Sequence, residues 1–82
     1  MTNFWLTYSR TDRRWILKKE KSDIVILHDR IKTEAWKKAV AHLQKRHHLT
    51  GEPASLKRMY KGGGIQGERT IPRSADPRSS RG

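Results

Sequence analysis

The hydrophobic positions near the start of the chain alternate with polar ones, which is the period of a β-strand. Residues 3–9 are rich in aromatic and β-branched side chains, which favour strands. Because neighbouring side chains of a strand point to opposite faces, only one alternate set can face a core. The two sets are Phe4, Leu6 and Tyr8, and Trp5, Thr7 and Ser9.

Four further segments have the pattern of strands. Residues 14–19 follow a short polar connection that suits a hairpin, and residues 23–27 contain a continuous apolar run of the kind found in strands buried on both faces. Residues 55–61 and 65–71 flank three consecutive glycines, which adopt positive φ without steric strain. The sequence therefore predicts a tight hairpin between the last two strands.

Between the third and fourth of these strands, the apolar period changes to that of a helix over residues 33–47. At 100° per residue, its apolar positions fall within one arc of about 140°, and most of its lysines lie outside this arc. Thr33 suits the N-cap, and Glu34 follows in the first turn, where the helix dipole favours a negative charge. The apolar arc consists of Ala35, Trp36, Ala39, Val40 and Leu43.

The predicted fold is α+β, with the element order β-β-β-α-β-β in a single antiparallel sheet. One helix packs on one face of this sheet, and we expect the other face to meet a partner or a second copy of the chain. Residues 1–71 form this single domain. Residues 72–82 contain one alanine as their only apolar residue apart from proline, so we expect a disordered basic tail.

Composition limits both the size of the core and the class of protein. Eighty-two residues allow one domain, and hydrophobic residues make up only 33% of them, so the core must be small. The chain has no cysteine, which excludes disulfides and thiolate zinc sites and suits a reducing, cytoplasmic location. No signal peptide and no membrane span are expected, because no long apolar run is present.

Positive charge is the dominant feature of the composition. The formal net charge is +11, and residues 30–48 hold six basic residues against one acidic residue. This excess is larger than solubility needs and predicts a polyanionic partner such as DNA or RNA, although a merely solvated helix face stays an alternative. The candidate phosphate-binding residues lie on the outer helix face and the following strand: Lys37, Lys38, Lys45, His48, Lys57 and Arg58.

Aromatic side chains near lysine and arginine provide a second candidate for nucleic-acid binding. Single-stranded nucleic acids stack their bases on such rings. Trp5 and Tyr8 are the candidates, since one alternate set of the first strand faces away from the helix. The alternative is that the rings fill the core, and this is the prediction for Trp15 and Trp36.

Other chemistry finds little support in the sequence. His42 and His47 lie five positions apart, on different sides of a helix, so no metal site is predicted. The glycine run precedes a strand rather than a helix, which argues against a nucleotide phosphate loop. No spacing places a base beside a nucleophile, so we expect neither an enzyme nor a bound cofactor.

A resemblance to a known family rests on short motifs. The chain has Trp15 in its second strand, Glu34-Ala35 at the helix start, Ala39 within the helix, and the sequence Gly-Ile-Gln-Gly-Glu-Arg-Thr-Ile-Pro over residues 64–72. In these features it resembles a small prokaryotic and phage family, the domain of unknown function 2188. The resemblance implies a fold of short strands, one helix and a final hairpin, and it implies no activity.

Two functions follow as hypotheses. The first is a basic, non-enzymatic module that contacts nucleic-acid phosphates through the lysine-rich helix face, with little reading of base sequence. The second is a protein-interaction module, of a kind a phage could encode, that uses the uncovered sheet face or a strand edge to bind an acidic protein or itself. The tail arginines Arg73, Arg78 and Arg81 are either an arm that contacts nucleic acid or a solvated terminus.

Overall fold

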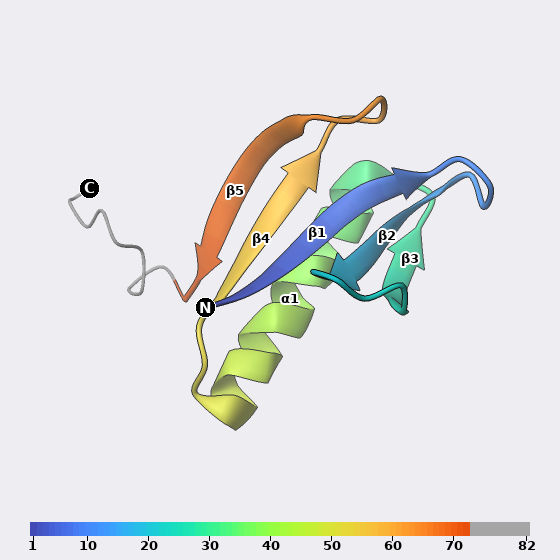
Figure 1. The fold of residues 1–82 in the computed structure, drawn as a ribbon. Helices are drawn as coiled ribbons and strands as arrows, with labels where there is room; N and C mark the ends of the chain where they lie inside the picture. The colour runs from blue at the N-terminus through green and yellow to red at the C-terminus, as the bar shows by residue number, and fades with distance from the viewer. Residues whose placement is uncertain (73–82) are drawn as a thin grey trace.

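The computed structural model describes residues 1–72 as five strands and one helix (Figure 1). The α+β class and the order of the elements are as predicted, whereas the predicted tail and its arginines lie outside the described residues, apart from Pro72. The elements are β1 (Thr2–Ser9), β2 (Arg14–Lys19), β3 (Val25–Asp29), α1 (Lys32–Thr50), β4 (Ala54–Met59) and β5 (Ile65–Ile71).

The sheet is mixed, so the prediction of a purely antiparallel sheet is wrong. The strand order is β3-β2-β1-β4-β5, and β1 runs parallel to β4 while the other neighbours are antiparallel. The reason is the direction of the chain. The first three strands alternate in direction, so β3 ends at the end of the sheet opposite to the start of β1. The helix α1 then brings the chain back to the end where β1 starts, and β4 therefore runs in the same direction as β1.

The core lies between α1 and one face of the sheet. Along β1, Phe4 and Leu6 are buried, while Trp5 and Thr7 alternate with them on the opposite face. We refer to the sheet face that α1 does not cover as the open face (Figure 1). The helix contributes only small or medium side chains to the fully buried core, which lets it lie close to the strands: Ala35, Ala39 and Leu43.

The helix is longer than predicted at both ends. It begins at Lys32, with Ile31 at the N-cap and no side-chain cap, so the prediction of Thr33 as N-cap is wrong. Asp29 fixes this end instead, because one carboxylate oxygen accepts the Ile31 N–H at 2.9 Å and the other pairs with Lys38 at 2.7 Å. The helix ends at Thr50, and Gly51 follows as the C-cap with a positive φ of 77°. The Gly51 N–H donates to the His47 carbonyl oxygen at 2.7 Å.

The third strand differs most from its prediction. It covers Val25–Asp29 rather than residues 23–27, and it is an edge strand with Val25 exposed rather than a strand buried on both faces. Its apolar run is interrupted by a bulge opposite the junction of Leu17 and Lys18. An apolar run alone does not distinguish a central strand from an edge, because a bulge can turn two successive side chains toward the helix.

Asp29 gives the fold a dependence on pH. Its hydrogen bond from the Lys38 ammonium, supported by the Ile31 N–H, holds the pKa of its carboxyl below the usual value. Its contribution to stability is therefore present above the unfolded-state pKa of about 4 and is lost as the pH falls through the lower folded-state pKa. Asp29→Asn should lower stability at neutral pH and flatten this acid dependence.

Urea unfolding at a series of pH values measures this effect. The matched control is Asp23→Asn, which replaces an exposed carboxylate just before the same strand. If both variants keep the parent pH profile, Asp29 does not anchor the helix start.

Candidate nucleic-acid interface

The structure divides the eight predicted binding residues among three surfaces rather than one. Four lie on the exposed side of α1, Trp5 and Lys57 lie on the open face, and Tyr8 and Arg58 lie on the helix-covered side. Lys57 and Arg58 are neighbours in β4 and therefore point to opposite faces. The helix and the following strand thus do not form one continuous basic patch. The four helix residues are Lys37, Lys38, Lys45 and His48.

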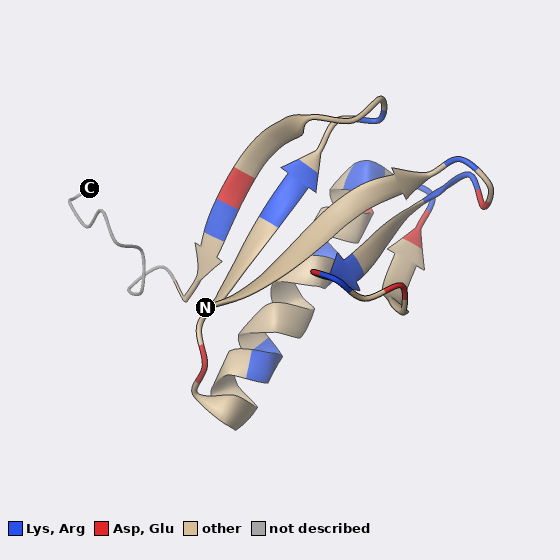
Figure 2. Cartoon of the chain, viewed as in Figure 1, with Lys and Arg blue, Asp and Glu red and all other residues tan. Residues whose placement is uncertain are grey.

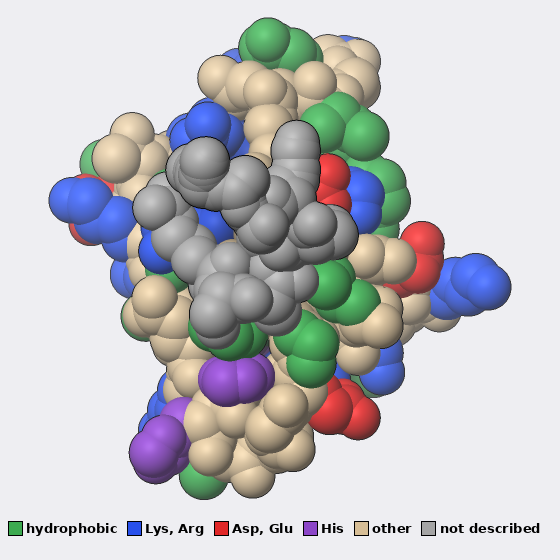
Figure 3. Space-filling view, turned by 90° about the vertical axis from the view of Figure 1, so that its left-hand side faces the viewer, with side chains coloured by type: hydrophobic (Ala, Val, Ile, Leu, Met, Phe, Trp, Pro, Cys, Tyr) green, Lys and Arg blue, Asp and Glu red, His purple; other side chains and the backbone are tan. Residues whose placement is uncertain are grey.

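On the outer side of α1, much of the positive charge is already compensated. Lys37 lies 3.7 Å from Glu34, and Lys38 pairs with Asp29 at 2.7 Å. Lys45 lies two turns farther along the helix, and the basic segments of α1 are separated in Figure 2. Figure 3 views the molecule from the left-hand side of Figure 1, where β5 lies, and there too basic, acidic and apolar side chains are intermixed. The helix therefore presents separated charges rather than a dense basic stripe.

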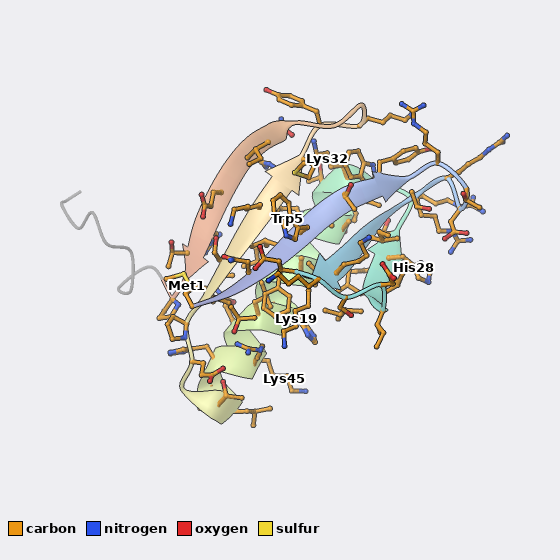
Figure 4. All side chains as sticks on the ribbon, viewed as in Figure 1. Met1, Trp5, Lys19, His28, Lys32 and Lys45 are labelled. Atoms are coloured by element: carbon orange, nitrogen blue, oxygen red, sulfur yellow. The ribbon has the colours of Figure 1, made fainter. Side chains whose placement is uncertain are left out.

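At the centre of the open face, a tryptophan lies between two lysines. Trp5 in the central strand β1 pairs in register with Lys18 of β2 and with Lys57 of β4. Figure 4 shows Trp5 in front of the strands, with α1 behind them. Its ring is partly exposed. This arrangement of one aromatic ring and two flanking ammonium groups follows from the sheet order.

The Lys57 side chain is held in place over the ring. Its Nζ lies 5.3 Å from the Trp5 ring centroid and donates to Asn3 Oδ1 at 3.3 Å and to Ser55 Oγ at 3.4 Å. Glu68 on β5 lies 3.6 Å from the same ammonium. The position of the lysine is therefore set before any ligand binds. This lowers the entropic cost of ordering the side chain on binding.

A second basic group lies on the same face nearer the β1–β2 hairpin. Arg14 donates from Nη1 to His28 Nδ1 at 3.2 Å, which assigns the acceptor role to this imidazole nitrogen. Both side chains line a shallow pocket together with Asp12, Ile16 and Val25. The open face therefore continues from Trp5 toward this pocket near the β3 edge of the sheet.

Tyr8 lies away from Trp5 and belongs to a different group of rings. Its ring packs edge to face against Trp15, with centroids 5.3 Å apart, so the two predicted stacking residues do not form one platform. Trp15 is buried in the core and Trp36 packs against it, as predicted. We define the cation–aromatic cluster as a group of four rings and three cations on the helix-covered side, near the β1–β2 and β4–β5 hairpins: Tyr8, Trp15, Trp36 and Tyr60, with Lys32, Arg58 and Lys61.

No metal site is found in residues 1–72. These residues contain no group of three or more histidine, cysteine, aspartate or glutamate side chains placed to hold a metal ion. Within the same range, α1 is too polar to cross a membrane. Comparisons with protein-family models, with curated proteins and with solved structures find no match to the chain. The resemblance to the domain of unknown function 2188 therefore stays a prediction.

The sequence interpretation missed three basic residues that the structure places beside aromatic rings. Lys18 alternates with Arg14 and Ile16 along β2, so the hairpin register contained the signal that it shares a face with Trp5. Lys32 and Lys61 carried no such signal, because their ring contacts join distant parts of the chain.

Replacing each tryptophan by alanine tests the assignment of the two faces. Trp15 is 7% exposed and lies in the core, so Trp15→Ala should lower the free energy of unfolding by about 3–5 kcal/mol. Trp5→Ala removes a partly exposed ring from the open face and should lower it by a clearly smaller amount. Urea unfolding of both variants measures the difference, and equal losses would show that Trp5 is also a core residue.

Proposed function

We propose that the protein is a small binding module without enzymatic activity that contacts nucleic acid. On this proposal, a single strand of DNA or RNA crosses the open face, one base stacks on Trp5, and Lys18 and Lys57 meet the phosphates on either side. The observation that carries the proposal is the register of Trp5 between these two lysines. Base stacking on an aromatic ring combined with basic side chains along the backbone is how single strands are bound with little sequence preference.

The chemistry of the open face favours this partner. Its centre is polar and basic around one aromatic ring, whereas a face made for a protein partner is typically more apolar at its centre. Arg14 extends the basic character toward the β1–β2 hairpin, and Glu68 is the acidic residue that lies against Lys57. A net charge of +11 adds long-range attraction for a polyanion.

The outer side of α1 supports the same function less strongly. Lys38 would have to leave Asp29, with which it pairs at 2.7 Å, to bind phosphate, and the one tryptophan of α1, Trp36, packs against the core. We therefore expect Lys37, Lys38, Lys45 and His48 to add general attraction rather than the main contacts.

Oligonucleotide binding at increasing salt tests the proposal. Fluorescence anisotropy with a labelled single strand, as DNA and as RNA, should show binding that weakens steeply as salt rises. Trp5→Ala should lose about 1–3 kcal/mol of binding energy, the value of one stacked base. Lys18→Gln with Lys57→Gln should reduce the slope of log affinity against log salt by about 1.4, since each phosphate contact on a single strand contributes about 0.7.

The matched control replaces two lysines on the other side of the molecule, Lys37→Gln with Lys45→Gln. It removes the same charge, so its loss of affinity should be clearly smaller if the open face binds the strand. No binding at low salt would refute the function. If only the variant with Lys37→Gln and Lys45→Gln loses affinity, the strand binds on α1 rather than on the open face.

A second candidate function is favoured by the free edge of β3. Ile24 is 74% exposed and Val25 is 42% exposed at this edge, which has no neighbouring strand within residues 1–72. Exposed β-branched residues on an unpaired edge favour pairing with another strand. On this candidate, a second copy of the chain pairs through β3.

Light scattering at several concentrations measures the mass in solution. A dimer that becomes a monomer with Ile24→Lys would support edge pairing. A monomer at every concentration would exclude it.

A further inference from the structure

We propose that the cation–aromatic cluster is a binding site for a nucleoside monophosphate, in which the three cations hold the phosphate and the exposed ring of Tyr60 meets the base. The site lies on the helix-covered side, so it is separate from the open face and does not depend on strand binding there. Its basic residues come from three distant segments: Lys32 at the start of α1, Arg58 in β4, and Lys61 after β4.

The cations lie against rings that form a connected group. Lys32 Nζ is 4.6 Å from the Trp15 ring centroid and 5.7 Å from that of Tyr60. Lys61 Nζ is 4.5 Å from the centroid of Tyr8, whose ring packs on Trp15. Cation–π contact holds such side chains in place and leaves their N–H groups free to donate to an anion.

The third cation approaches from the sheet. The Arg58 guanidinium carbon lies 4.7 Å from the Trp36 ring centroid. Its Nε is buried and has no hydrogen-bond partner in the described part of the chain. A buried donor without a partner is unfavourable unless a ligand or another group accepts from it.

Carboxylates do not balance these charges. The four ion pairs formed within residues 1–72 involve Lys37, Lys38, Arg46 and Lys57, and none of the three cluster cations takes part in one. Lys32 donates to the neutral side chain of Gln66 instead. An anion would therefore relieve repulsion between like charges that the described residues leave without a carboxylate partner.

The pKa of Lys32 responds to this repulsion. Partial burial and the nearby Arg58 guanidinium hold the pKa of the Lys32 ammonium below its usual value. A bound phosphate would act in the opposite sense, because a negative charge favours the protonated amine.

Tyr60 distinguishes a nucleotide from a bare phosphate. It is 54% exposed, although Lys32 lies over its ring. An exposed ring beside a cation offers a flat apolar surface next to the phosphate position, which is the arrangement that a base and its 5′-phosphate require. Adenosine would contact only the ring and inorganic phosphate only the cations, so both should bind more weakly than AMP.

Titration of the 82-residue chain with AMP, inorganic phosphate and adenosine tests the proposal. Binding is followed by tryptophan fluorescence, since Trp15 and Trp36 lie under the cations, and by the shift of the melting temperature at constant ionic strength. AMP should raise the melting temperature and bind more tightly than either fragment. Lys32→Gln and Lys61→Gln should each weaken AMP binding about tenfold, the effect of losing one charge-assisted hydrogen bond.

Two controls separate this site from the rest of the molecule. Lys37→Gln removes an exposed helix lysine and should leave AMP binding unchanged. Trp5→Ala should also leave it unchanged while it weakens binding of the single strand, so failure of one proposal does not imply failure of the other. Lys61→Gln keeps the test valid if Lys32→Gln unfolds the helix start, because Lys61 lies in an exposed turn.

Three results would overturn the proposal. The first is no shift of the melting temperature by AMP at millimolar concentration. The second is AMP affinity in folded Lys61→Gln equal to that of the parent. The third is equal affinity for AMP and inorganic phosphate, which would exclude the contact between the base and Tyr60.

Discussion

The parallel pairing of β1 with β4 is the constraint on which the rest of this structure depends. It places β1 at the centre of the sheet, with β2 on one side and β4 on the other. Every second residue of β1 then faces α1, and the others face away. Phe4 and Leu6 are buried in the core, and Trp5 lies between two lysines on the open face. The same pairing that builds the core thus also builds the candidate interface.

The core is small, and cation–aromatic contacts extend it at one end. Beneath the middle of the sheet, Ala35, Ala39 and Leu43 bring α1 close to the strands. Toward the hairpins, large rings replace aliphatic side chains, and the charged groups of Lys32, Arg58 and Lys61 lie over them. A chain with few aliphatic residues can bury area in this way. The high net charge and the small core are therefore related, because charged side chains cover the aromatic rings that extend the core.

The element order and the α+β class could be predicted from local patterns, because alternation and helical period are local properties. The mixed sheet could not be predicted from the same patterns, since the direction of β4 depends on where α1 returns the chain. For the site, alternation placed Trp5 and Tyr8 on opposite faces of β1, but it left open which of the two faces the core. It could also have separated Lys57 from Arg58, which are adjacent and face opposite ways. The contacts of Lys32 and Lys61 with rings of other segments required the three-dimensional structure.

Nuclear magnetic resonance mapping of a single strand on the labelled protein tests the central claim most directly. The three tryptophans each give an indole N–H signal, and Trp5 lies on the open face, whereas Trp15 and Trp36 belong to the cation–aromatic cluster on the helix-covered side. The account predicts that a short oligonucleotide shifts the indole signal of Trp5 and the backbone amides of Lys18 and Lys57 most strongly. Shifts confined to the amides around Lys37 and Lys45, with the Trp5 signal unchanged, would contradict it.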